Sequence, residues 1–278
     1  MIKWKYLIIF PLVASAISGT SCMFIPEDSE NNKKEISISD MTLVWADEFD
    51  SGTAPNTDYW SYETGAGGWG NNEKQTYTAD SSNVYVSDGT LKIKAIKDSY
   101  GTWTSGRIKT AGKKYWKYGY VEANIKLPEG NSGIWPAFWM MPNESVYGSW
   151  PRSGEIDIME YSPGSVANAC YSTLHHSSSE ADAGTDVYPS LGRTVIDNRT
   201  NEFHKYGILW TQDYIETFYD GKSLGTQYLK GNKNWVEWPY DQNFFIILNL
   251  AMGGNLGKII PSDLTEATYE IDYVRVYQ

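Results

Sequence analysis

The run EIDIME over residues 155–160 places three carboxylates within six positions. In an extended strand alternate side chains point to opposite faces, so Glu155 and Asp157 share one face and the two isoleucines share the other. Strict alternation would put Glu160 on the apolar face, where burying a charge is costly. One extra residue, a β-bulge near Met159, would return Glu160 to the acidic face, and bulges are common beside active sites.

The spacing of these carboxylates suits glycoside hydrolysis with retention. With the bulge, Glu155 and Glu160 lie about 13 Å apart along the backbone, and side chains leaning together would bring the carboxyls to about 5–6 Å. At that separation one carboxylate attacks carbon and the other moves a proton, whereas inverting enzymes need a wider gap. We predict Glu155 as nucleophile, Glu160 as general acid/base, and Asp157 as the group that hydrogen-bonds the nucleophile and tunes its ionisation. Spacing alone also allows an acidic solvent-exposed strand face or a cation site.

The elements that must position this run are strands. Residues 83–87, 91–95 and 269–277 alternate and are rich in β-branched and aromatic side chains, which predicts strands. Asp-Gly pairs at 88–89 and 220–221 predict hairpin turns. No segment has the pattern of a long amphipathic helix. Many strands without helices predict a sandwich or jelly roll.

Composition limits the classes of partner. With 41% hydrophobic and 21% charged residues the 278-residue chain can bury a core. It contains 12 Trp and 21 Tyr, more than core packing alone would explain. The formal net charge of -11 should repel nucleic acid and anionic membrane surfaces, so we expect neither as a partner. We expect a monomer.

The N-terminus has the pattern of an export signal. The apolar stretch 6–17 follows two lysines and is too short for a membrane span, which needs about 20 residues. We expect a signal peptide over residues 1–21, then a lipidated Cys22 in a sequence that resembles a loose bacterial lipobox, then a polar tether over 22–40. Ala-Ser-Ala at 14–16 offers an ordinary signal-peptidase site instead. The protein would then be a cell-surface or outer-membrane lipoprotein, touching a membrane only through its anchor, or else secreted or periplasmic.

The sequence SGEIDIMEY at 153–161 closely resembles the signature of glycoside hydrolase family 16 in its bulged form. Further segments resemble the first strand and the laminarinase-type cleft segments of that family: 45–49, 68–73, 104–107, 133–140 and 249–254. The resemblance implies a catalytic domain over 41–278, a β-jelly-roll of two curved antiparallel sheets with a substrate cleft across the concave face. It also implies endo-hydrolysis with retention, the carboxylate roles given above, and no cofactor for catalysis.

The same resemblance implies substrate-binding residues. Sugars present C–H faces to aromatic rings, so Trp135, Trp139 and Trp150, which precede the acidic strand, would be platforms, with core packing as the alternative. Asn72 and Arg107 would bond sugar hydroxyls, and a surface ion pair is the alternative for Arg107.

A histidine is also expected in the cleft. His175 matches the position where the family places a histidine near the acid/base, Glu160, although a structural role is the alternative. Joint metal ligation by His175 and His176 is disfavoured because adjacent strand residues face opposite ways. Glu73 is a further candidate, with a solvent-facing carboxylate as the alternative.

Members of the family often hold a structural calcium ion. Asp272, the backbone carbonyl of Gly89 and an oxygen of Glu48 would be its ligands, because Ca²⁺ takes oxygen ligands. The ion would have no role in the chemistry, and an ordinary strand aspartate is the alternative.

Two segments depart from the pattern of the family. Leu256 stands where laminarinase-type members carry a tryptophan, and the stretch 177–193 has no obvious match. Both lie where subsites are set. We expect a retaining endo-glycosidase that hydrolyses internal β-linkages of an extracellular polysaccharide, a β-1,3- or mixed-linkage β-1,3/1,4-glucan. The alternatives are an endo-β-galactosidase acting on galactans or mucin-type O-glycans, and an inactive surface glycan-binding protein, against which the three intact carboxylates argue.

Overall fold

The computed structural model describes residues 37–130, 132–162, 169–195 and 202–278. The predicted signal peptide, Cys22 and the tether as far as residue 36 lie outside the described residues. Ser37–Gln278 forms a compact unit. Within the ranges described, no helix is long and apolar enough to cross a membrane.

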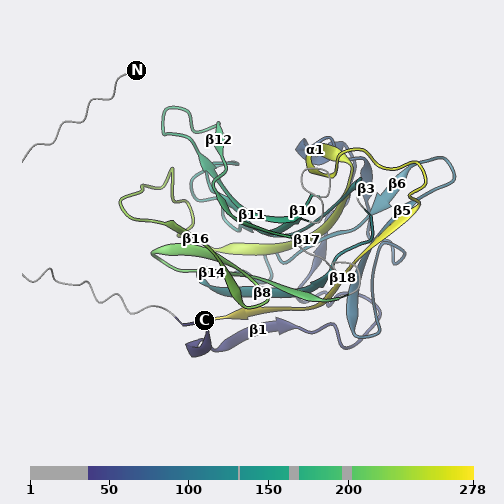
Figure 1. The fold of residues 1–278 in the computed structure, drawn as a ribbon, viewed down its shortest axis with the longest axis horizontal. Helices are drawn as coiled ribbons and strands as arrows, with labels where there is room; N and C mark the ends of the chain where they lie inside the picture. The colour runs from purple at the N-terminus through teal and green to yellow at the C-terminus, as the bar shows by residue number, and fades with distance from the viewer. Residues whose placement is uncertain (1–36, 131, 163–168, 196–201) are drawn as a thin grey trace, which may run out of the picture. The chain divides into compact units, whose positions relative to one another are not determined.

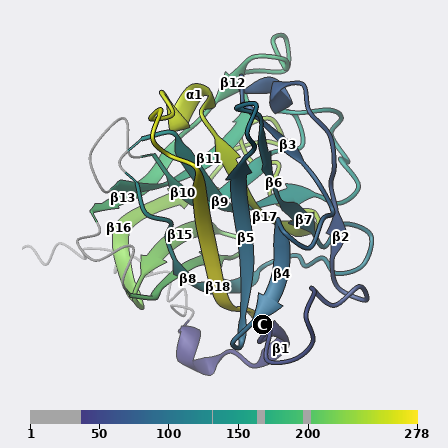
Figure 2. The same cartoon turned by 90° about the vertical axis from the view of Figure 1, so that its right-hand side faces the viewer.

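The first sheet has ten strands in the order β16-β15-β14-β8-β18-β5-β6-β3, with β1 also paired to β18 and β4 to β5. Its strands are β1 (Leu43–Asp47), β3 (Gln75–Tyr77), β4 (Val84–Ser87), β5 (Thr90–Lys97), β6 (Trp103–Ser105), β8 (Gly119–Lys126), β14 (His204–Trp210), β15 (Tyr214–Tyr219), β16 (Lys222–Leu229) and β18 (Glu266–Tyr277). All of its pairings are antiparallel except that of β3 with β6, which is parallel. Figure 2 shows β18, β5 and β4 running side by side in this layer.

The second sheet has eight strands in the order β12-β11-β10-β9-β17-β7-β2, with β13 also paired to β11. Its strands are β2 (Ser61–Tyr62), β7 (Arg107–Lys109), β9 (Ile134–Pro142), β10 (Glu155–Tyr161), β11 (Ala169–Ser177), β12 (Asp186–Val187), β13 (Ser190–Val195) and β17 (Phe244–Met252). The helical elements are short: η1 (Ile38–Asp40), η2 (Gly68–Gly70) and α1 (Gly254–Gly257). Figure 1 shows the two sheets as stacked layers, with β10, β11 and β17 in one and β8, β14 and β18 in the other. The predicted all-β sandwich is confirmed.

The predicted strands and turns are present. Residues 83–87, 91–95 and 269–277 fall in β4, β5 and β18, with ends shifted by a few residues. In the turn at 88–89 the φ angles are 52° and 72°, and in the turn at 220–221 they are 47° and 72°. Positive φ at both central residues is what a tight hairpin between twisted strands requires, and Asp-Gly adopts it readily.

The core between the sheets takes up only part of the aromatic content. Trp60, Trp210 and Trp238 are fully buried in it, together with aliphatic side chains from both layers. Cys170 on β11 is buried in the same core. The remaining tryptophans include several that lie on the outer side of the second sheet, where the acidic run is found.

The predicted bulge is present in β10. Asp157 pairs with Trp139 of β9, and Met159 pairs with Phe138, which is adjacent to Trp139. Two steps along β10 thus match one step along β9, so Ile158 is the extra residue. Ile158 and Met159 are both buried, with 2% and 0% exposure, while Glu160 is partly exposed. Two consecutive apolar side chains thus enter the core, and Glu160 returns to the face of Asp157.

This register predicts the effect of shortening β10. Deletion of Met159 would let Ile158 take its place opposite β9 and would leave Glu160 on the same face. The variant should fold, with a free energy of unfolding lower by about 2–5 kcal/mol, the cost of losing a buried methionine side chain. Deletion of Ile158 and Met159 together would turn the Glu160 carboxylate into the core and should prevent folding. Urea unfolding followed by tryptophan fluorescence measures both, and equal stability of the two variants would contradict the register.

Candidate active site

A cavity of about 430 Å³ lies over the face of the second sheet that carries the acidic run. Strands β7, β9, β10, β11 and β17 supply its floor, and η2, α1 and β12 add residues at its margins. Glu155, Asp157 and Glu160 all line this cavity. The outward face of β10 therefore brings the three carboxylates to one open site, while the two isoleucines anchor its inner face.

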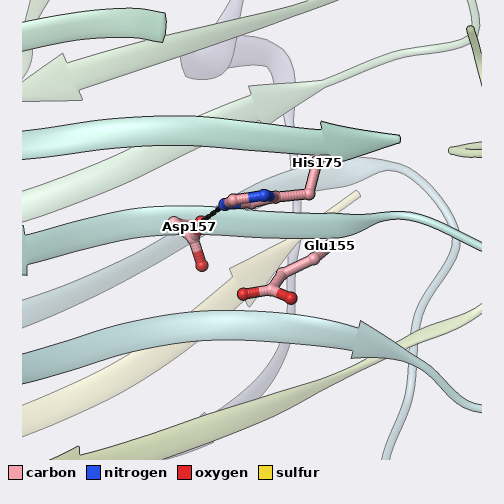
Figure 3. A group of neighbouring side chains, drawn as sticks. All are labelled: Glu155, Asp157 and His175. Carbon is pink, nitrogen blue, oxygen red and sulfur yellow. Dashed lines mark ion pairs between the residues drawn. The ribbon is translucent and has the colours of Figure 1, made fainter. Parts of the chain in front are cut away.

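Asp157 is the most enclosed of the three carboxylates. It is 2% exposed, whereas Glu155 and Glu160 are partly exposed. His175 lies opposite Glu155 on β11, and its Nε2 is 3.1 Å from Oδ2 of Asp157. Figure 3 shows the imidazole reaching across to Asp157, with the Glu155 carboxylate beside them. A cationic imidazole would thus partly neutralise the cluster.

Each of the two glutamates has a tryptophan N–H as its own donor. Nε1 of Trp150 donates to Oε2 of Glu155 at 2.7 Å, and Nε1 of Trp135 donates to Oε1 of Glu160 at 3.0 Å. Trp150 is 49% exposed and Trp135 is 8% exposed, yet both line the cavity. These two indoles therefore hold the carboxylates in place as well as forming walls, a role that the sequence did not predict.

Arg107 lies between two indole rings in the cavity. Its guanidinium carbon is 4.8 Å from the ring centroid of Trp69 and 4.8 Å from that of Trp139. Its Nε donates to Glu63 at 2.6 Å, and Lys109 donates to the other oxygen of that carboxylate. Burial opposes ionisation of Glu63, but Arg107 and Lys109 hold the pKa of that carboxyl below its ordinary value. Arg107 is thus ion-paired, as the alternative reading allowed, but it lines the cavity.

A buried hydrogen-bond network supports the wall behind Trp139. Trp139 donates to Oδ1 of Asn249 at 2.7 Å, and Nδ2 of Asn249 donates to the hydroxyl of Tyr77 at 3.0 Å. The Tyr77 hydroxyl donates to Oε2 of Glu73 at 3.1 Å, where Gln75 also donates. Glu73 is 9% exposed, so the solvent-facing alternative is wrong, and burial raises its pKa.

Asn72 lies beside the cavity but is not among the residues that line it. Its φ of 60° turns the side chain toward Asn255 on α1, to which it donates at 3.0 Å, and it is exposed. Its neighbour Asn71 lines the cavity instead, together with Asn255 and Leu256. Contact of Asn72 with sugar hydroxyls stays a prediction.

The sequence placed His175 near Glu160, on whose pKa its charge acts. In the pairing of β10 with β11, however, Glu160 lies opposite Tyr171, and His175 lies opposite Glu155 and beside Asp157. The antiparallel register decides this, because the bulge shifts the pairing between Asp157 and Glu160. His175 is therefore a partner of the Glu155 end of the cluster.

Several site residues were missed by the sequence analysis. Trp69, Asn71, Asn249 and Asn255 line the cavity. The first three lie in segments that had already been compared with the cleft of the family, so a signal for them existed. Asp186 also lines the cavity, and its Oδ2 is 2.8 Å from Nδ1 of His175. It belongs to the unmatched stretch 177–193 and carried no signal.

Burial and crowding raise the pKa of every carboxyl in the cluster. Burial and the charge of Asp157 raise the pKa of Glu155, and burial and the charge of Glu160 raise the pKa of Asp157. For Glu160, burial and the charge of Glu155 raise the pKa to about 7. Burial disfavours the cationic form of His175, but Asp157, Glu155 and Asp186 outweigh it and raise its pKa to about 10. His175 is therefore an imidazolium at neutral pH.

The predicted calcium ligands have other partners. Arg275 donates to both oxygens of Glu48, at 2.8 and 2.7 Å, and Asn124 donates to Oδ2 of Asp272 at 2.9 Å. The carboxylate of Glu48 is thus engaged by a guanidinium, which leaves its backbone oxygen, the backbone carbonyl of Gly89 and oxygens of Asp272 as candidates. Calcium at this place stays a prediction.

Three comparisons with known proteins agree with one another. Residues 71–275 match the family model of the glycosyl hydrolases family 16. The glucan endo-1,3-beta-glucosidase A1 of Niallia circulans is 40% identical over 274 residues, an alignment that covers 87% of this chain and 38% of that longer protein. The beta-glucanase of Rhodothermus marinus is 38% identical over 247 residues, covering 85% of each chain.

Solved structures extend the likeness to three dimensions. The laminarinase from Flavobacterium sp. UMI-01 is similar with a TM-score of 0.74 and 39% identity, over 85% of this chain and 100% of that one. The predicted jelly roll of two large sheets is confirmed by this match. Because both the sequence pattern and the fold are shared over most of its length, the chain belongs to the glycosyl hydrolases family 16 and is a glycoside hydrolase.

Proposed function

We propose that the protein is a retaining endo-glycosidase that cuts internal β-1,3 linkages of a β-glucan, including glucans of mixed β-1,3/1,4 linkage. The observation that carries the proposal is β10, which presents Glu155, Asp157 and Glu160 to an open cavity with a separate indole donor on each glutamate. The names of the relatives, an endo-1,3-beta-glucosidase and a laminarinase, support the choice of β-glucan.

The proposed reaction has two steps. Glu160 gives its proton to the glycosidic oxygen as the C–O bond breaks, while Glu155 attacks the anomeric carbon and forms a covalent glycosyl-enzyme. Water then attacks the same carbon, Glu160 takes its proton, and the bond to Glu155 breaks. The raised pKa of Glu160 keeps it protonated close to neutral pH, as the first step requires.

The nucleophile must be ionised in this scheme. A carboxylate oxygen of Glu155 lies within 4.8 Å of one of Asp157, so the two carboxyls ionise as a coupled pair that holds one proton between them as the pH falls. When Asp157 carries that proton, Glu155 is a carboxylate, and the N–H of Trp150 stabilises its charge. Asp157 therefore acts on the reaction through the ionisation of its neighbour.

The walls of the cavity suit a neutral sugar chain. Trp69, Trp139 and Trp150 offer ring faces, and Arg107, Asn71 and Asn255 offer polar groups that sugar hydroxyls can bond. The cavity lies on an open sheet face and is not a closed pocket, which supports cleavage within a chain.

Substrate and stereochemistry can be tested together. The purified protein should release reducing ends from laminarin and barley β-glucan, and not from agarose, keratan sulfate or mucin O-glycans. Proton NMR of the first products should show the β-anomer ahead of mutarotation. Cleavage of the galactose-containing glycans alone would favour an endo-β-galactosidase, an initial α-anomer would contradict retention, and binding of laminarin without cleavage would identify an inactive glycan-binding protein.

Substitution of the glutamates separates their roles. Glu160→Gln should lower kcat on laminarin by about 10²- to 10⁴-fold, the usual contribution of a general acid. It should cost much less on an aryl β-glycoside with a good leaving group, which needs little protonation, whereas Glu155→Gln should abolish activity on both. Glu144→Gln, an exposed glutamate outside the cavity lining, is the control. Equal losses on both substrates for Glu160→Gln would reassign the acid.

The pH dependence follows from Glu160. Because its protonated form is active, kcat should fall as the pH rises through about 7. The N–H of Trp135 lowers the pKa of Glu160, so Trp135→Phe should move this limb of the pH profile upward by about one unit. Trp139→Phe, on the same strand, removes an N–H that donates to Asn249 and should leave the limb in place. A downward shift, or the same shift in both variants, would show that Glu160 does not set this limb.

A further inference from the structure

His175 is held by carboxylates at both of its ring nitrogens. Nε2 is 3.1 Å from Oδ2 of Asp157, and Nδ1 is 2.8 Å from Oδ2 of Asp186. A ring nitrogen that faces a carboxylate carries a proton, so the two contacts fix both the protonation and the rotation of the imidazole. We propose that Asp186 is a positioning residue, which holds His175 against Asp157 and so keeps the acid cluster aligned for the proposed glycosidase reaction.

Asp186 is placed by the strand that carries His175. It begins β12 and pairs with Ser177, two residues beyond His175 on β11. The turn ahead of it is also tied to the end of β11, because Ser178 N–H donates to the Thr185 carbonyl at 2.9 Å and the Ser177 hydroxyl donates to the Ala183 carbonyl at 2.6 Å. The carboxylate of Asp186 therefore lies on a short hairpin that hydrogen bonds tie to the end of β11. Such a hairpin can hold the side chain of His175 in place.

Groups from several elements enclose the imidazole. The ring centroid of Trp150 is 6.0 Å away and that of Tyr188 is 6.1 Å away. The hydroxyl of Tyr240 donates to the backbone carbonyl of His175 at 2.9 Å. The charged groups that act on the ring are Asp157, Glu155 and Glu160 from β10 and Asp186 from β12. Of these, Asp186 alone lies outside the acidic run.

The imidazolium links Asp186 to the reacting carboxyls. Its positive charge lowers the pKa of Glu155, Asp157 and Glu160, against the burial that raises them. Loss of Asp186 would release Nδ1 and let the imidazolium turn away from Asp157, and the pKa values of all three carboxyls would rise as that positive charge moves away. The pH profile should then move to higher pH at both limbs. These are the rise of activity as the nucleophile ionises and the fall of activity as Glu160 loses its proton.

A direct contact with substrate is the competing role for Asp186. The residue lines the cavity, and its Oδ1 is buried without a hydrogen-bond partner among the described residues. A residue that binds sugar equally in the ground and transition states changes KM, whereas one that aligns the reacting groups changes kcat.

Variants of Asp186 distinguish the two roles. Asp186→Asn keeps the size but removes the charge, and kcat should fall about tenfold with little change in KM and with both pH limbs shifted upward. Asp186→Glu should restore part of the rate. The matched control is Asp220→Asn, which removes the charge from the remote His204–Asp220 pair of 2.9 Å and should leave kcat and the profile unchanged.

Three outcomes would overturn the proposal. A higher KM with unchanged kcat would make Asp186 a sugar contact. A lower kcat with an unmoved pH profile, or loss of activity in Asp186→Glu equal to that in Asp186→Asn, would reduce it to general support of the hairpin.

A second measurement does not depend on activity. The chain has three histidines, so ¹⁵N NMR of the ring nitrogens can follow His175 by itself. Its pKa of about 10 should fall in Asp186→Asn and stay unchanged in Asp220→Asn. An unchanged His175 titration in Asp186→Asn would refute the contact. If the parent protein cuts no glycan, the proposed function fails, while this titration still decides the role of Asp186.

Discussion

Repulsion among three carboxylates on one strand is the constraint around which the site is built. Each raises the pKa of a neighbour, and burial adds to the effect. Stability of such a cluster requires compensating donors and a cation, and these come from other elements. Trp150 and Trp135 donate to the two glutamates, and the imidazolium of His175 faces Asp157. The same crowding leaves Glu160 with a pKa near neutral, which suits a general acid.

Packing between the two sheets stabilises this arrangement, because it fixes the inner face of β10. Its apolar residues, including both members of the bulge, pack in the core between the sheets. Strand β9 then supplies Trp135, the loop ahead of β10 supplies Trp150, and β11 supplies the histidine opposite Glu155. Tryptophan is used in two ways: some indoles are wholly buried in the core, while others line the cavity with N–H groups that bond Glu155, Glu160 or Asn249.

The margins of the cavity come from segments that are less regular than its floor. On one side α1 contributes Asn255 and Leu256, and on the other β12 contributes Asp186. These are the segments that depart from the pattern of the family in sequence. When the strands at the floor of a cavity are common to a family and the segments at its margins differ, the chemistry is kept while the choice of substrate varies.

The sequence by itself determined the strands, the Asp-Gly turns, the bulge in β10 and the three carboxylates, because strand periodicity and turn chemistry are local properties of the chain. Only the tertiary structure decided which groups meet those carboxylates. That His175 faces Asp157, that Asn71 and not Asn72 lines the cavity, and that Asp186 reaches His175 all follow from strand register and loop path. Contacts between residues distant in sequence, such as Trp135 with Glu160, depend on how strands pair, and a single-residue shift reverses every side chain.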